Sequence, residues 1–322
     1  MTKTELTPPG YADAAELARL AVITRHAVVF AIEFIDIVRD NGHILDTLLA
    51  SAIIQANVQP IQRDGDLFMA FAKSDAVPPD TLRRPVSMNA LANSLGLPFE
   101  TVRRRVNAMV PTGWCRIVEE GVIVPAETLD TPKHYAQAFQ GFQRLQAFYY
   151  ALSELGLLRD LPPPSVDLGA NPFPIRACTR LLGAYMLRAI EGVGALGALM
   201  DGLILLAMFR NNVEGLPTDA IVAAPPGAPD GMADDLRRPV SVATLGAQLG
   251  IPPETIRRHV TVLIERGYCV RVRGGLIVPG HILAHPLLWA GAARNAGNLQ
   301  RLFVALAQLG VLRAWDGVRP PR

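Results

Sequence analysis

The sequence predicts a mainly helical protein with small β-hairpins, arranged as two tandem units that form a pseudo-dimer within one chain. The first observation is a repeat, because residues 80–125 and 234–279 are identical at about half of their positions without a gap. The second is composition: 50% of the residues are hydrophobic and only 19% are charged, which is typical of a chain that builds a core. The third is the spacing of apolar residues by threes and fours beside each copy, which indicates amphipathic helices.

Weaker matches extend the repeat in both directions and define the expected domains. Upstream, Asn57-Val58 corresponds to Asn212-Val213, and downstream the segment 152–159 corresponds to 306–313. Two domains also agree with a length of 322 residues. We therefore expect unit one at 1–160, a proline-rich linker at 161–171 and unit two at 172–322.

Each unit is expected to begin with apolar helices, to continue through an irregular stretch rich in proline and aspartate, and to end in one long helix. The apolar stripes of the two long helices are typical of core, and they are also suited to pack on each other across a pseudo-twofold axis. The predicted helical regions are 12–57 and 175–212, the irregular stretches are 59–82 and 215–236, and the long helices are 131–156 and 282–312.

Between these helices, each copy of the repeat begins with a short extended segment, because the residue before Pro85 is biased away from the helical conformation. Ser87 and Ser241 are expected to cap the helix that follows. Gly96 and Gly250 are expected to end that helix in the left-handed conformation.

A second helix follows, with Pro98 or Pro252 near its start. In the first copy its inward residues are expected to be Val102, Val106 and Met109, and its outward residues Thr101, Arg104 and Arg105. Two short alternating strands joined by a very tight turn complete each copy. Helix, tight turn and helix form the helix-turn-helix motif, whose second helix can enter the major groove of DNA.

Residues 81–125 and 235–279 resemble the winged helix-turn-helix of bacterial transcription regulators, particularly the Crp/Fnr type, whose second helix reads Arg-Glu-Thr-Val-x-Arg. The resemblance implies that the glutamates and arginines of this pattern face base edges while the threonines meet phosphate. The family's first arginine is replaced by Phe99 and Pro253, which leaves the preferred operator sequence open. The helices that frame each copy resemble the layout of MarR-type regulators, which dimerise through such helices. The matching residues are Glu100, Thr101, Val102 and Arg104 in the first copy, and Glu254, Thr255, Ile256 and Arg258 in the second.

Double-stranded DNA is the expected partner, and the function is transcription regulation. Arginine can bind guanine bidentately and glutamate can accept from cytosine, whereas arginines outside the second helix are expected beside the phosphates. The first hairpin carries Glu119-Glu120 where the second carries Arg273-Gly274, so unit two is expected to contribute more phosphate affinity, and the operator is expected to be asymmetric. The predicted DNA-binding residues are Arg83, Arg84, Glu100, Thr101, Arg103, Arg104, Arg105 and Arg116, followed by Arg237, Arg238, Glu254, Thr255, Arg257, Arg258, His259, Arg271 and Arg273.

An enzyme is not expected, because the sequence has no Gly-rich phosphate loop, nucleophile elbow or carboxylate–histidine constellation, and no cofactor or metal is predicted. The N-terminal segment does not resemble a signal peptide, and the most apolar run, 193–209, is short and contains Asp201. Three cysteines at 115, 178 and 269 imply no disulfide framework. These observations predict a cytoplasmic protein with no membrane partner.

Three alternatives stay open. The arginines can meet an acidic protein partner instead of DNA, because winged helices also serve protein–protein contact. A small-molecule effector can bind among the apolar helices beside Asp46 or Asp201, although close helix packing explains the glycines there equally well. Further homodimerisation of the whole chain is also compatible with the sequence.

Overall fold

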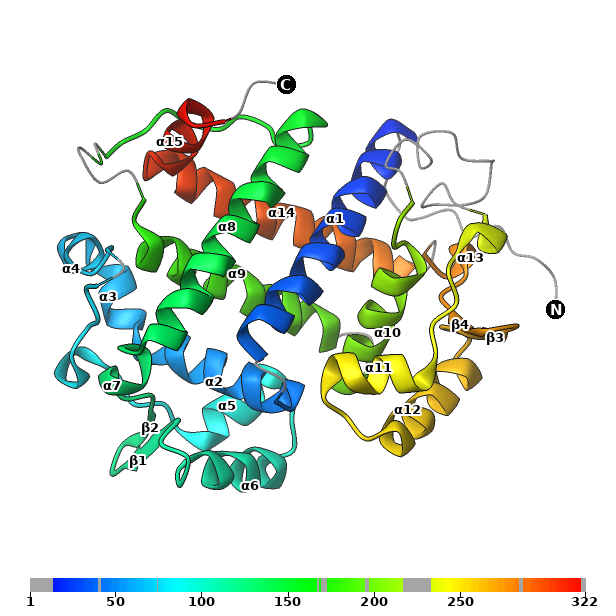
Figure 1. The fold of residues 1–322 in the computed structure, drawn as a ribbon, viewed down its shortest axis with the longest axis horizontal. Helices are drawn as coiled ribbons and strands as arrows, with labels where there is room; N and C mark the ends of the chain where they lie inside the picture. The colour runs from blue at the N-terminus through cyan, green and yellow to red at the C-terminus, as the bar shows by residue number, and fades with distance from the viewer. Residues whose placement is uncertain are drawn as a thin grey trace. The chain divides into compact units, whose positions relative to one another are not determined.

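A computed structural model describes residues 14–39, 42–73, 75–166, 168, 173–194, 197–216, 233–283 and 286–319. These residues are mainly helical and carry two small antiparallel hairpins, β1–β2 and β3–β4 (Figure 1). The predicted combination of helices with small β-hairpins is therefore confirmed. No helix within these ranges combines the length and the apolar character that a membrane crossing needs.

The chain forms two compact units, and these are not the contiguous halves expected at 1–160 and 172–322. One unit contains the described residues of Met1–Asp36 together with those of Gly192–Gly297. The other contains those of Ile37–Glu191 together with Asn298–Arg322. The proline-rich composition of 161–171 indicates a connecting segment. The boundaries of a compact unit depend instead on which apolar helix faces pack together.

Module one, defined as α5, α6, β1 and β2, lies in the second of these units. The helix region predicted at 12–57 is divided into α1, which belongs mostly to the other unit, and α2. The irregular stretch predicted at 59–82 instead contains two short helices. Pro60 lies in the first turn of α3, where proline is tolerated, and the Asp64 side chain accepts hydrogen bonds from the first amides of α4. The elements of this unit are α2 (Ile44–Asn57), α3 (Gln59–Arg63), α4 (Gly65–Ala70), the 3₁₀ turn η1 (Asp80–Leu82), α5 (Met88–Leu95), α6 (Phe99–Met109), β1 (Arg116–Val118), β2 (Gly121–Ile123), α7 (Ala126–Leu129), α8 (Pro132–Glu154), most of α9 (Ile175–Gly194) and α15 (Val311–Gly317).

Module two, defined as α11, α12, β3 and β4, lies in the unit that contains most of α1. A small core cluster there joins Leu20 and Ala21 of α1 to Trp289 of α14. Of the irregular stretch predicted at 215–236, residues 217–232 lie outside the described part of the chain. The elements of this unit are most of α1 (Ala14–Arg39), α10 (Leu199–Asn212), η3 (Asp234–Leu236), α11 (Val242–Leu249), α12 (Pro253–Glu265), β3 (Val270–Val272), β4 (Gly275–Ile277), α13 (Gly280–Leu283) and part of α14 (Pro286–Gln308).

The first helix of each module begins and ends where the sequence predicts. Ser87 Oγ accepts a hydrogen bond from Ala90 N at 3.1 Å, and Ser241 Oγ accepts one from Thr244 N at 3.0 Å. Gly96 and Gly250 end α5 and α11 in the left-handed region, with φ of 60° and 62°. The buried residues of the second helices are Val102, Val106 and Met109 in α6, and Ile256, Val260 and Leu263 in α12.

The extended segment before each first helix pairs with the second strand of the hairpin. Val86 bridges Val122 in module one, and Val240 bridges Leu276 in module two. Gly121 allows this approach, because a Cβ built on it would lie 2.5 Å from Val86 O, and its φ is 145°. The predicted order of extended segment, two helices and two strands is therefore confirmed in both modules.

A buried asparagine fastens each module to the helix that precedes it. The Asn57 side chain, at the end of α2, donates to Arg84 O at 2.8 Å and Val122 O at 3.1 Å, and accepts from Val124 N at 2.8 Å. Asn212, at the end of α10, makes the matching bonds to Arg238 O (2.8 Å), Leu276 O (3.1 Å) and Val278 N (2.9 Å). Both asparagines are 0% exposed. A buried side chain that satisfies three backbone groups sets the position of the hairpin relative to the framing helix.

Candidate nucleic-acid interface

The exposed start of each second helix carries a glutamate and an arginine that bind each other. Arg103 Nη2 lies 2.7 Å from Glu100 Oε2 in α6, and Arg257 Nη1 lies 2.8 Å from Glu254 Oε2 in α12. The hydrogen bond from Arg103 holds the pKa of Glu100 below its ordinary value. Solvent competes with such exposed ion pairs, so the glutamate and the arginine can release each other and bind a ligand instead.

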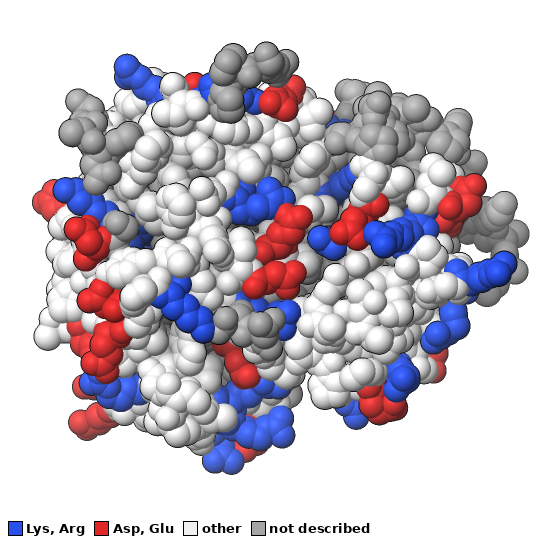
Figure 2. Space-filling view, viewed as in Figure 1, with Lys and Arg blue, Asp and Glu red and all other residues white. Residues whose placement is uncertain are grey.

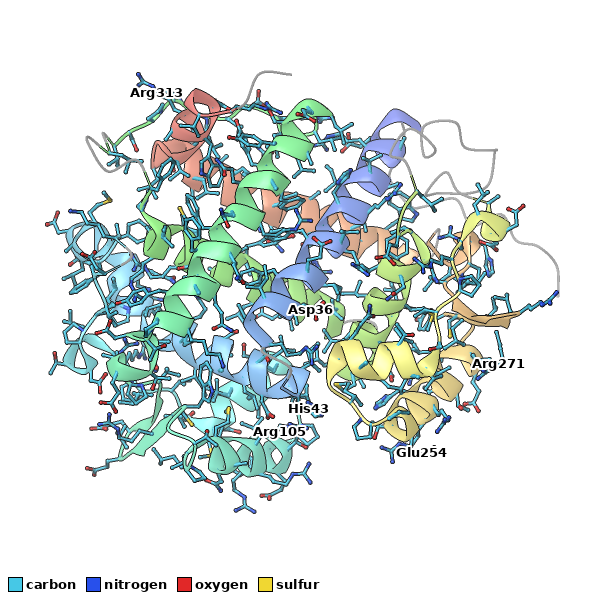
Figure 3. The ribbon with its side chains drawn as sticks, viewed as in Figure 1. Asp36, His43, Arg105, Glu254, Arg271 and Arg313 are labelled. Atoms are coloured by element: carbon cyan, nitrogen blue, oxygen red, sulfur yellow. The ribbon has the colours of Figure 1, made fainter. Side chains whose placement is uncertain are left out.

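The third residue of each predicted basic run turns away from the outer face, which corrects the expectation for Arg105 and His259. Arg105 Nη1 lies 2.7 Å from Asp46 Oδ1 of α2, and Arg105 Nη2 lies 2.9 Å from His43 Nε2 (Figure 3). Burial, and then the charge of Arg105, lower the pKa of His43. In module two His259 Nδ1 lies 2.6 Å from Asp201 Oδ1 of α10. Each side chain is drawn inward by the acid of the framing helix, so neither is placed to contact DNA.

Arg83 and Arg237 are buried, which corrects the expectation that they lie beside phosphates. Their side chains are 0% exposed and approach Asp80 at 3.3 Å and Asp234 at 2.9 Å. Arg83 also donates to a backbone carbonyl, that of Pro78, at 2.9 Å. A charge that is removed from solvent needs such partners to remain in the fold. These two arginines support the modules and offer nothing to an external polyanion.

Arg104 and Arg258 are exposed, and each has no hydrogen-bond or ion-pair partner among the residues that the structure describes. They occupy equivalent positions on α6 and α12, beside the Glu–Arg pairs. Thr101 and Thr255, one helical turn earlier, are half-buried. Each second helix therefore presents one uncommitted guanidinium on its outer face, with five N–H donors that suit base edges or phosphate.

The remaining predicted residues surround the second helices and are exposed. Arg84 donates to Gln59 Oε1 at 3.1 Å, whereas Arg238 binds Glu214 Oε2 at 3.1 Å. Arg116 lies on β1, where it approaches Asp80. Arg271 and Arg273 lie on and beside β3, and Figure 3 shows Arg271 on the hairpin. Figure 2 shows basic atoms over α6 and along the side of module two that carries α12 and the β3–β4 hairpin.

Sequence reasoning did not assign the polar residues that organise each module. They lie in the elements that precede each module: Asp46, Asn57 and Asp80 before module one, and Asp201, Asn212 and Asp234 before module two. Asp80 Oδ1 accepts from Ala126 N at 2.7 Å, and Asp234 Oδ1 accepts from Gly280 N at 2.7 Å. The available signal was their identity in both copies at a spacing of 154 or 155 residues, which singles out polar positions that the fold needs.

Comparisons of this chain with protein-family models, with curated protein sequences and with solved structures found no match. The three cysteines are buried and unpaired in disulfides. Among the described residues, no group of three or more histidine, cysteine, aspartate or glutamate side chains is arranged to hold a metal ion.

Proposed function

We propose that this chain is a DNA-binding transcription regulator whose helices α6 and α12 enter the major groove of double-stranded DNA. The observation that carries the proposal is the pair Arg104 and Arg258. Both are exposed at the same position of the second helix of a helix-turn-helix, and neither has a partner in the described part of the chain. An α-helix fits the major groove, and arginine is the side chain that most often makes a specific contact there.

The neighbouring Glu–Arg pairs support this proposal. On docking, Arg103 or Arg257 gains phosphate oxygens, and the glutamate released from it can accept a hydrogen bond from cytosine. The Asn57 and Asn212 bonds fix each hairpin on α2 or α10, the helix on which the second helix of the module also packs. A hairpin in that position is next to the sugar–phosphate backbone, where contacts set register without reading sequence.

We also propose that the modules arose by tandem duplication and that both belong to the winged-helix type. Support comes from their equal strand register and from the matching Asn, Asp and Arg contacts. The proposal implies a cytoplasmic chain that docks as an intrachain pseudo-dimer. A regulator that also binds a small-molecule effector among its apolar helices is the alternative form of this proposal.

The proposal is tested by fluorescence anisotropy of the full chain with labelled genomic DNA fragments at 50 and 200 mM salt. Each bidentate arginine contact contributes roughly 1–3 kcal/mol, so Arg104→Ala and Arg258→Ala should each weaken binding to a selected fragment about 5- to 150-fold. Arg313→Ala is the matched control, because Arg313 is an exposed arginine outside both modules. It should leave binding unchanged.

Absence of binding at 50 mM salt would overturn the DNA proposal, since non-specific phosphate contacts are strongest at low salt. The exposed arginines would then favour the second candidate, a winged helix that binds an acidic protein surface. Equal losses in Arg104→Ala and Arg313→Ala would show that only general positive charge matters and would also contradict base contact by α6.

A further inference from the structure

We infer that the two modules contact DNA unequally: the β3–β4 hairpin of module two binds phosphate, whereas the β1–β2 hairpin of module one is kept from it by its own acids. This inference rests on the proposed function and assigns the backbone contacts within it. It begins from the fact that the two hairpins have the same geometry. Arg116 pairs with Ile123 as Val270 pairs with Ile277, and Val118 pairs with Gly121 as Val272 pairs with Gly275.

Because the register is identical, the charges can be compared position by position. The turn of module one holds Glu119 and Glu120, both exposed, and the turn of module two holds Arg273 and Gly274. Residues 114–121 contain one arginine and two glutamates, a net charge of −1, whereas residues 268–275 contain two arginines and no acid, a net charge of +2. The two hairpins thus have the same strand register but differ in net charge by three.

Ion pairing increases this difference. Arg116, the single basic residue of the first hairpin, lies 3.2 Å from Asp80 and 3.7 Å from Glu127. Its charge is therefore already balanced by acids of η1 and α7, the elements that flank module one in the sequence. Arg271 and Arg273 are exposed, and neither has an ion-pair partner within the described residues. Only the second hairpin can neutralise phosphates without first losing a partner.

The size of the effect follows from counterion release. Each neutralised phosphate adds about −0.9 to the slope of log K against log salt, so two contacts from Arg271 and Arg273 add about −1.8. Between 50 and 200 mM salt this corresponds to a loss of affinity of about twelvefold that depends on these two residues alone. A like-charged hairpin at the other half-site adds nothing to the slope.

The test measures salt slopes of the full chain on a double-stranded fragment selected from genomic DNA. Arg271→Ala/Arg273→Ala should reduce the magnitude of the slope by about 1.8, and Glu119→Arg/Glu120→Gln should increase it by about 1. Phosphate-ethylation interference should show the hairpin contacts, which are those that Arg271→Ala/Arg273→Ala removes, at one half-site only in the wild type. The Glu119→Arg/Glu120→Gln variant should add the equivalent contacts at the other half-site. All four side chains are exposed, so circular dichroism and the melting temperature should match the wild type; Arg313→Ala is the charge control.

An unchanged slope in Arg271→Ala/Arg273→Ala, with wild-type binding intact, overturns this inference and leaves the proposed function standing. Hairpin contacts at both half-sites in the wild type overturn it in the same way. A wild-type chain that binds no DNA at 50 mM salt overturns the proposed function and this inference together. A variant that fails to melt like the wild type is replaced by Arg273→Gln alone, for which the expected reduction is about 0.9.

Discussion

Replacing Asn57 by alanine removes the side chain that joins α2 to the extended segment and to the hairpin of module one. The side chain is 0% exposed, and its three hydrogen bonds are 2.8–3.1 Å long. Alanine occupies the same helical position without strain, because it is the strongest helix former. The substitution therefore isolates the loss of these bonds from any change in the helix itself.

The magnitude depends on which backbone groups lose their last partner. Val122 O keeps a second donor, Val86 N, at 3.1 Å, so it remains satisfied. Val124 N is buried and loses the acceptor that Asn57 supplied. Arg84 O is partly exposed, and water can take the place of the amide. At about 1–3 kcal/mol for each unsatisfied buried group, plus a small cavity, we expect Asn57→Ala to lower the free energy of unfolding by about 2–4 kcal/mol.

Urea denaturation followed by circular dichroism measures this change, and hydrogen exchange with mass spectrometry locates it. Faster exchange should appear in the peptide containing Val124 for Asn57→Ala, and in the peptide containing Val278 for Asn212→Ala. Asn93→Ala is the matched control, because Asn93 is exposed on α5. It should change stability by less than about 0.5 kcal/mol, because surface substitutions rarely do more.

A loss below about 1 kcal/mol in Asn57→Ala, comparable with the control, would refute this argument, since the unsatisfied amide of Val124 alone costs that much. The argument would also be refuted if the Val124 peptide exchanged equally fast in Asn57→Ala and Asn212→Ala, and the Val278 peptide did the same. In that case the asparagine would not hold its own module.

Further predictions concern groups that the fold buries. Arg83→Met should lower the free energy of unfolding by about 1–3 kcal/mol in urea denaturation, because Asp80 loses its buried partner. It should leave the salt slope of DNA binding unchanged. A reduced slope would mean that Arg83 does contact phosphate. Burial, and then the charges of Arg176 and Arg83, lower the pKa of His134 from 6.5 to about 4. The unfolded chain therefore binds the extra proton, so stability is fully present above pH 6.5 and is lost as the pH falls toward about 4. Urea denaturation across this window should show a shallower loss in His134→Gln, and parallel curves would contradict the assignment. Burial raises the pKa of the Cys115 and Cys269 thiols to about 11, so iodoacetamide at pH 8 should modify them only on unfolding, as mass spectrometry can check; rapid labelling of the native chain would contradict their burial.

Much of each module could be predicted from sequence because the determining interactions are local. Ser87 starts α5 and Gly96 ends it through contacts within three or four residues, and the inward positions of α6 follow from helical periodicity. The helices α3 and α4 were missed for a related reason. A stretch rich in proline and aspartate indicates irregular structure, yet Pro60 and Asp64 belong to residue types that also favour helix starts when the following residues can continue the helix.

The candidate site was only partly predictable, because the state of each arginine depends on distant residues. Arg105 is bound by Asp46, 59 residues earlier, and His259 by Asp201, 58 residues earlier. Nothing in the basic runs 103–105 and 257–259 distinguishes the inward residue from the outward one. Only the approach of α2 and α10 to the second helices does so.

The sequence by itself determined that two similar modules exist, where their helices begin and end, and which hairpin is acidic and which is basic. Those properties depend on neighbouring residues and on composition. The tertiary structure alone decided that Arg83, Arg105, Arg237 and His259 are committed within the fold while Arg104 and Arg258 remain exposed. It also decided that the first helix of the chain packs with residues far along the sequence. Burial and ion pairing are long-range properties, since each needs two segments to meet in space before either side chain has a partner.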